Sequence, residues 1–456
     1  MDALNGLKKL DSESIDCVMT SPPYWALRDY GAGTERVWDG DDGCEHRWEI
    51  EKGIRSSWGN KDTLTDKKQG TNRGAEDNVS ALEKESNFCS KCGAWKGQLG
   101  LEPTFDLYIK HLCDIFDEVK RVLKKTGTCW VNLGDSYNSN HEVGTTDGKK
   151  GWKHGAISTD YQGRGGDSSL PTKCLCQIPS RFSIEMTNRG WILRNEIIWY
   201  KPNCMPSSVK DRFTVDFEKI FFFTKNKKYW FEQQFDKNQD CSIERGNYGY
   251  VGNAETGYPN GKQFSEKNTL AAQNLNPLGR NKRTVWKICP KPFPGSHFAV
   301  FPEELCETPI KSGCPEFICK KCGVVREKVY EEGELISSCD YLPMVKKPRS
   351  EPQNRMIKGD LPKDPYGALP KRDKKFIGYS DCKCNAGFQG GIVLDPFGGR
   401  GTVGRVAKEQ GKNYIILDIS QKFCDMAKDY IKFGDSYGKV INTRKVHKQL
   451  KTWTEE

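Results

Sequence analysis

A glycine-rich turn with the sequence DPFGGRGT constrains the fold of this chain most strongly. The turn follows an apolar run over 391–394, begins at Asp395 and leads into a helical pattern over 403–410. A second apolar run then ends in Asp418. Two short apolar runs on either side of a helix are typical of a βαβ unit with parallel strands. We therefore expect an α/β fold, with a largely parallel sheet and helices on both of its faces.

The same turn indicates a binding site for a nucleotide-like cofactor. Glycines allow a ligand to approach the backbone closely, and an acid such as Asp418 at the end of the second strand suits the two hydroxyl groups of a ribose. The sequence contains no GxxxxGK[ST] pattern, so a phosphate-binding P-loop is not indicated. Taken alone, the turn is also compatible with a purely structural role.

A second motif, TSPPY, closes an apolar run over 15–20. Its two prolines fix the backbone, so the Ser21 hydroxyl and the neighbouring carbonyl groups point in fixed directions. Tyr24 offers a flat face on which a planar ring can stack. Hydrogen-bond acceptors beside an aromatic face suit the exocyclic amino group of a heterocycle. A plain turn at the end of a strand is the alternative for this motif alone.

Together, the two motifs resemble the catalytic and cofactor motifs of the amino-group DNA methyltransferases, which use S-adenosylmethionine. Because TSPPY precedes DPFGGRGT, the order resembles that of the permuted β-class. The resemblance implies a Rossmann-like methyltransferase sheet with helices on both faces and double-stranded DNA as the partner. Further segments similar to this family are residues 24–31, 93–103, 132–137, 197–206 and 297–305.

The resemblance also implies roles for single residues. The catalytic motif, which consists of Ser21, Pro22, Pro23 and Tyr24, would hold a base flipped out of the duplex together with its amino group. Relatives usually show a strand and then GDAL where this chain begins with MDAL, so the presence of that first strand stays open. The expected cofactor-binding residues are Asp395, Phe397, Gly399, Gly401, Thr402, Asp418, Phe298 and Pro302.

The resemblance favours N4 of cytosine as the methylated atom. Serine stands at the head of SPPY, where the adenine N6 enzymes more often have aspartate; N6 of adenine is the alternative. A cytosine-C5 enzyme would need a nucleophilic cysteine, usually in a Pro-Cys pair, and the sequence has no such pair. RNA and protein methyltransferases usually carry NPPY after the cofactor motif, so both residue and order disagree. A catalytically dead, zinc-dependent DNA-binding module is a second alternative.

The cysteines indicate metal binding. The chain has 19 of them, an odd number, and no secretory leader, which argues against a disulfide framework. Two polar stretches each contain a Cys-x2-Cys pair and a second close pair of ligands, as tetrahedral structural zinc requires. Ordinary exposed thiols are the alternative. The two predicted ligand sets are Cys44, His46, Cys89 and Cys92, and Cys319, Cys322, Cys382 and Cys384.

Charge and hydropathy fit a protein that binds a polyanion inside the cell. Lysine and arginine exceed aspartate and glutamate by 71 − 61 = 10. The sequence has neither a run of about 18 apolar residues nor an apolar leader. We expect a cytoplasmic, nucleoid-associated protein of a prokaryotic or phage-infected cell. A cognate restriction endonuclease is a further candidate partner, and both a monomer and a homodimer stay open.

Changes in composition divide the chain into methyltransferase segments and polar insertions. We expect methyltransferase segments at 1–38, 101–137, 177–231, 285–315 and 391–435, the first with the catalytic motif and the last with the cofactor motif; zinc-binding insertions at 39–100 and 316–390; DNA-recognition regions at 138–176 and 232–284; and a basic tail at 436–456.

Overall fold

The structure is a computed structural model with two units, which we describe separately. The first unit comprises Met1–Cys314 and Ile392–Glu456, and the second comprises Pro315–Gly391. Phe298, the tail 436–456 and most of the two expected recognition regions lie outside the described residues. The residues that the structure describes are 1–31, 33–54, 81–138, 169–237, 279–290, 301–336 and 371–434.

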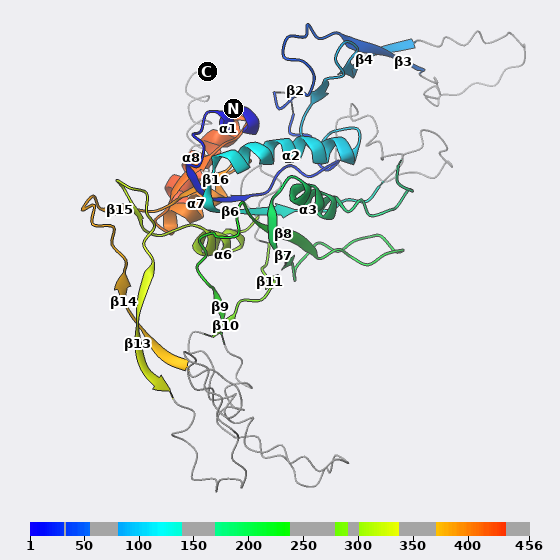
Figure 1. Ribbon diagram of the computed structural model, residues 1–456. Helices are drawn as coiled ribbons and strands as arrows, with labels where there is room; N and C mark the ends of the chain where they lie inside the picture. The colour runs from blue at the N-terminus through cyan, green and yellow to red at the C-terminus, as the bar shows by residue number, and fades with distance from the viewer. Residues whose placement is uncertain are drawn as a thin grey trace, which may run out of the picture. The chain divides into compact units, whose positions relative to one another are not determined.

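The first unit is built on a seven-stranded mixed sheet (Figure 1). β8 runs antiparallel to both of its neighbours, β6 and β7, and the other adjacent pairs are parallel. The predicted α/β class is confirmed, with one antiparallel strand in the sheet. In spatial order the strands are β11 (Val285–Lys287), β7 (Ile192–Tyr200), β8 (Phe217–Thr224), β6 (Leu123–Leu133), β1 (Ile15–Thr20), β16 (Ile392–Asp395) and β17 (Asn413–Ile416).

Alternating apolar side chains give this sheet a buried core on each face. Phe221 and Phe223 pack with helices α1, α2 and α3, whereas Ile220 and Phe222 pack with α6 and α7. Successive side chains of a strand point to opposite faces, which explains how one apolar run serves both cores. The helices are α1 (Ala3–Lys8), α2 (Phe105–Val122), α3 (Ile178–Asn188), α6 (Glu303–Gly313), α7 (Thr402–Glu409) and α8 (Gln421–Phe433), the last of which packs against α7.

A second, four-stranded sheet of the first unit packs on α2 through a buried histidine. The His111 ring stacks with the rings of Trp38 and Trp95, with centroid distances of 4.6 and 5.6 Å. Its two ring nitrogens lie 3.0 Å from Glu102 and 3.1 Å from Asp39. The four-stranded sheet is therefore fixed to the core of the first unit. In spatial order its strands are β2 (Arg36–Trp38), β5 (Trp95–Gly97), β4 (Ala81–Cys89) and β3 (Trp48–Ile54).

The remaining strands form short antiparallel pairs. β9 (Phe235–Asp236) pairs with β10 (Arg280–Asn281) in the first unit. In the second unit, β12 (Ile318–Cys319) pairs with β15 (Phe388–Gln389), and β13 (Lys328–Ile336) pairs with β14 (Lys371–Tyr379). Among the described helices, none has the length and apolar character needed to span a membrane.

Candidate active site

A cavity of about 640 Å³ opens in the first unit where the neighbouring strands β1 and β16 end. The carboxyl ends of adjacent parallel strands are the usual place for a ligand in an α/β sheet. Both sequence motifs contribute to its wall. The predicted site residues that line it are Ser21, Pro22, Pro23, Tyr24, Phe397, Gly399, Thr402 and Asp418. Three others, Asp395, Gly401 and Pro302, lie beside lining residues in the chain but not among them.

Hydrogen bonds hold the SPPY segment in place at the cavity wall. The hydroxyl group of Tyr108, on α2, donates to the Pro23 carbonyl oxygen over 2.7 Å. The Ser21 hydroxyl lies 3.3 Å from the Tyr24 hydroxyl. Because the prolines restrict the backbone, these contacts fix the serine hydroxyl and the tyrosine ring on the same side of the cavity. The segment can therefore present a hydrogen-bond acceptor and an aromatic face to one ligand.

Two residues without a role in the sequence analysis contact the Tyr24 hydroxyl, and a third forms an ion pair with one of them. This hydroxyl donates to Glu218 over 2.7 Å, and the side-chain amide of Asn132 donates to Tyr24 and Glu218 over 2.7 and 2.8 Å. Lys201 forms an ion pair with Glu218. Burial, and then the Glu218 carboxylate, raise the pKa of Tyr24 well above its usual value, so the phenol stays neutral. All four residues line the cavity.

Asp395 connects the two motifs. Its Oδ1 accepts hydrogen bonds from the Thr20 hydroxyl over 2.6 Å and from the Phe397 backbone N–H over 3.0 Å. The side chain is buried, and this burial raises the pKa of Asp395 to about 7. Asp395 therefore shapes the glycine turn and fixes it to the end of β1.

The glycine turn is held against the second strand by Asp418. One carboxylate oxygen accepts from the Gly399 N–H over 2.9 Å, and the other accepts from the Ser420 N–H over 2.8 Å. Gly401 is the N-cap of α7 with a φ of +86°, and a Cβ there would lie 2.8 Å from Ala427. A residue larger than glycine would displace α8. The local sequence thus fixes a tight turn whose backbone faces the cavity.

The buried Asp395 carboxyl group predicts a pH dependence of stability. Its pKa is raised above the unfolded value, so its contribution to folding is complete below about pH 4 and is lost as the pH rises through about 7. Asp395→Asn keeps an oxygen acceptor for Thr20 and Phe397 but cannot ionise. We expect the variant to gain stability relative to the wild type between pH 5 and pH 8. Urea unfolding of the variant and the wild type at pH 5 and at pH 8 measures this. If the two proteins differed in free energy of unfolding by the same amount at both pH values, the prediction would be contradicted.

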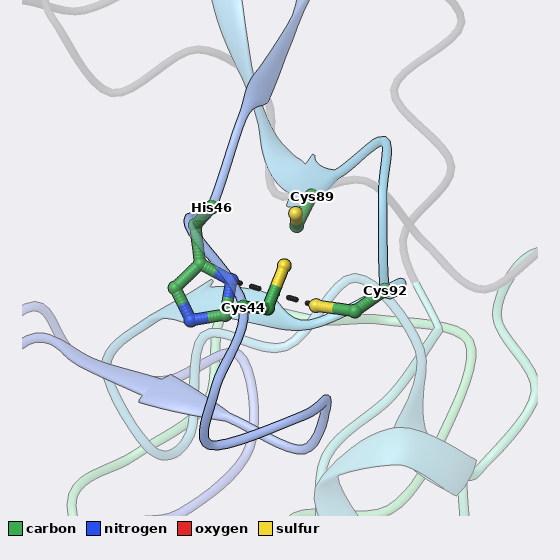
Figure 2. Close-up of side chains that lie close together, drawn as sticks. All are labelled: Cys44, His46, Cys89 and Cys92. Atoms are coloured by element: carbon green, nitrogen blue, oxygen red, sulfur yellow. Dashed lines mark hydrogen bonds between the residues drawn. The ribbon is translucent and has the colours of Figure 1, made fainter.

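The structure brings the first cysteine set together (Figure 2). The ligand atoms of Cys44, His46, Cys89 and Cys92 all lie within 4.8 Å of one another. His46 Nδ1 and Cys92 Sγ are 3.4 Å apart, and the backbone N–H of Arg47 donates to Cys89 Sγ over 3.4 Å. Three sulfur atoms and one imidazole nitrogen are a donor set that suits tetrahedral zinc.

The second cysteine set is brought together in the second unit. The sulfur atoms of Cys319, Cys322, Cys382 and Cys384 also lie within 4.8 Å of one another. The backbone N–H groups of Cys322 and, next, Lys321 lower the pKa of Cys319 to about 6. Because the thiolate is the form that binds metal, this turn favours the ligating form of the sulfur. Four sulfur donors again suit tetrahedral zinc.

Comparison with known proteins identifies the family. Residues 15–319 and 375–429 match the model of the DNA methylases that comprise the N6 and N4 methyltransferases. The chain belongs to this DNA methylase family. The predicted S-adenosylmethionine-dependent DNA methyltransferase with amino-group chemistry is therefore confirmed, and the methylase acts on double-stranded DNA. The match covers both chemistries, so it does not choose between N4 of cytosine and N6 of adenine.

Relatives of the methylase align along most of its length. The type II methyltransferase M.SmaI of Serratia marcescens is 27% identical over 432 residues, which cover 94% of this chain and 88% of the relative. M.SfiI of Streptomyces fimbriatus is 28% identical over 468 residues, which cover 92% of this chain and 87% of the relative. Among solved structures, PvuII DNA methyltransferase (cytosine-N4-specific) aligns over 97% of this chain and 88% of that chain, at 13% identity and a TM-score of 0.41.

The four-stranded sheet forms part of the cavity wall of the methylase. Arg36 and Trp38 of β2 line the cavity, as do Gln98 and Leu99 just after β5. The Arg36 guanidinium donates to the carboxylate of Asp2, another lining residue, over 2.5 Å. Sequence analysis predicted metal binding in residues 39–100 and a family resemblance over 93–103, but it did not place this sheet at the cavity wall, because the contact with the N-terminal segment depends on the fold.

Proposed function

We propose that this DNA methylase methylates N4 of cytosine at a specific site in double-stranded DNA, with N6 of adenine as the alternative. The observation that carries the proposal is Ser21 at the head of SPPY, with its hydroxyl in the same cavity as the glycine turn. A hydroxyl beside an aromatic ring can bind an amino group without carrying a charge. S-Adenosylmethionine supplies a methyl group that is activated by a sulfonium charge.

The target amino group lies inside the duplex, so the base is first flipped into the cavity. There the Ser21 hydroxyl and the Pro22 carbonyl group accept the amino hydrogens, and Tyr24 stacks on the ring. The amino nitrogen would then attack the methyl carbon in line: the nitrogen–carbon bond would form as the sulfur–carbon bond breaks, S-adenosylhomocysteine would leave as a neutral thioether, and the proton released from the nitrogen would pass to water. Positioning supplies much of the rate enhancement. Asn132 and Glu218 hold the Tyr24 hydroxyl and so keep the ring in place.

The glycine turn would hold the cofactor. Phe397, Gly399 and Thr402 line the cavity and would contact the cofactor, and Asp418 would bind the ribose. Asp395 would act indirectly, because its carboxylate accepts a hydrogen bond from the backbone of Phe397 and so positions the turn. The roles of Gly401, Pro302 and Phe298 stay predictions from the family resemblance.

We propose structural zinc in both cysteine sets. Support comes from the convergence of four sulfur or nitrogen ligands in each set. The metal would fold each insertion, since small polar segments of this kind gain their stability from the ion. The predicted division into methyltransferase segments, insertions, recognition regions and a basic tail is kept as part of the proposal.

The cellular setting is also a proposal. Relatives named type II methyltransferases support a role in a restriction–modification system, with a cognate endonuclease as a partner. We propose that the methylase acts in the cytoplasm on nucleoid DNA, as a monomer or a homodimer.

Mass spectrometry of nucleosides tests the base assignment. Plasmid DNA is incubated with the purified methylase and S-adenosylmethionine, and Ser21→Ala serves as the control for activity of this site. We expect N4-methylcytosine with the wild type and a large loss with the variant. N6-methyladenine alone would overturn the base assignment. No methylated nucleoside on several DNAs, together with no cofactor binding, would favour the zinc-dependent DNA-binding module.

A further inference from the structure

The connection between β7 and β8, residues 201–216, carries the most exposed large apolar side chains of the described chain. Phe213 is 96% exposed and Met205 is 89% exposed, whereas no other large apolar side chain among the described residues exceeds 63%. An aromatic side chain that stays exposed to water contributes no free energy of burial to folding. This connection, which we call the β7–β8 loop, therefore has the character of a binding element.

Several contacts anchor the loop and leave Phe213 projecting from it. At its base, the Lys201 N–H donates to the Asp216 carbonyl oxygen over 2.7 Å. Further out, Lys173 pairs with Asp211 over 2.7 Å, and the Arg212 guanidinium lies 3.4 Å from the ring centroid of Tyr137. The residue directly before Phe213 is thus held by an aromatic contact. The phenylalanine is exposed although its neighbour is anchored.

The same loop borders the active-site cavity. Lys201 and Met205 near its start and Val215 near its end line the cavity, together with Ser21 and Tyr24 of the catalytic motif. Met205 is thus both exposed and part of the cavity wall, and Phe213 stands two residues before the lining residue Val215. The loop therefore places an exposed aromatic side chain close in sequence to the wall of the pocket proposed to receive the base.

We infer that Phe213 enters the DNA stack at the position that the flipped base leaves. The inference rests on the proposed function, in which a base is extruded from double-stranded DNA. Extrusion leaves a gap in the stack, and proteins that distort DNA insert apolar side chains between base steps. Lys210 and Arg212 place two positive charges within three residues of Phe213, which suits the flanking phosphates.

A second copy of the chain is the competing partner for this apolar surface. Two observations favour DNA. The loop borders the catalytic cavity, which a duplex substrate must reach in every turnover. In addition, three consecutive charged residues, Lys210–Arg212, stand directly before Phe213, whereas the buried centre of a protein interface is depleted of charged residues.

The test compares two DNA substrates for each enzyme variant. One is a duplex that contains the methylation site, which sequencing of DNA methylated by the wild type identifies. The other is identical except for an abasic position opposite the target base, which makes extrusion easier. We expect Phe213→Ala to lower kcat/KM on the intact duplex by about tenfold or more and to lose most of that defect on the abasic duplex. The affinity for S-adenosylmethionine should not change.

Two further variants sharpen the test. Phe213→Leu keeps an apolar side chain and should retain most of the activity. Ile184→Ala removes another exposed apolar side chain, 60% exposed on α3, and should behave as the wild type on both substrates.

Full activity of Phe213→Ala on the intact duplex, or an equal loss on both substrates, would overturn the inference. Conversion of a dimer to a monomer by Phe213→Ala, seen in sedimentation, would assign the loop to a second copy instead. Absence of methylation by the wild type would instead refute the proposed function, so the two failures are distinguishable.

Discussion

Replacing Tyr24 with alanine is expected to lower kcat by at least about a hundredfold, since catalysis here depends on placement of the base. The tyrosine ring forms one wall of the cavity, and its hydroxyl joins Ser21 to Asn132 and Glu218. The variant would lose both the stacking surface and this connection. Binding of S-adenosylmethionine should persist, because the glycine turn does not depend on Tyr24. Single-turnover methylation and calorimetric cofactor titration measure the two effects.

Tyr24→Phe separates the two parts of this effect. It keeps the ring and removes only the hydroxyl, so Glu218 retains its ion pair with Lys201 but loses the tyrosine as a donor. We expect a loss of kcat smaller than that of Tyr24→Ala. Unchanged turnover in the alanine variant would refute the role of Tyr24 in holding the base. A loss of cofactor affinity equal to the loss of turnover would show that it acts on the fold instead.

Cys89→Ser is expected to remove one of two zinc ions and to weaken S-adenosylmethionine binding by at least about tenfold, or about 1.4 kcal/mol. Cys89 ends β4, which pairs with β5, and β5 pairs with β2. From β2, Arg36 reaches Asp2 at the cavity wall. Loss of the metal would therefore disorder a wall of the cofactor cavity. Metal analysis, thermal unfolding and calorimetry measure the three consequences.

Cys322→Ser is the matched control. It removes a ligand of the second cysteine set, and the cavity-lining residues all belong to the first unit. We expect the same loss of zinc with an unchanged affinity for S-adenosylmethionine. If both variants bind the cofactor as the wild type does, the four-stranded sheet has no part in shaping the pocket. If the wild-type protein contains no zinc, the metal proposal fails.

The parts of the site that could be predicted are those that the chain encodes locally. The glycine turn after β16 and the proline-fixed turn after β1 are contiguous segments whose residue types determine their conformation. The cysteine pairs were recognisable from their spacing, and the structure brings each predicted set together. In each case the signal lies within a few residues, so the sequence reveals it without a knowledge of the fold.

The residues that escaped prediction depend on pairing between distant segments. Glu218 reaches Tyr24 only because β8 lies beside β6 in the sheet, and Asn132 reaches both for the same reason. Glu218 directly precedes the run Lys219–Thr224 in the sequence, yet charges at strand ends are common and carry little information. The stacking of His111 with two tryptophans likewise depends on how the four-stranded sheet packs on α2.

The bond between Thr20 and Asp395 joins residues 375 positions apart, and this has a consequence for synthesis of the protein. The two strands that carry the catalytic and cofactor motifs are neighbours in space, but a ribosome delivers the second one roughly 20–75 s after the first, at roughly 5–20 residues per second. A nascent chain therefore cannot methylate DNA, and the edge of β1 that pairs with β16 stays unpaired until β16 has been synthesised. Any premature stop before β16 should yield an inactive product that chaperones and proteases recognise as incomplete.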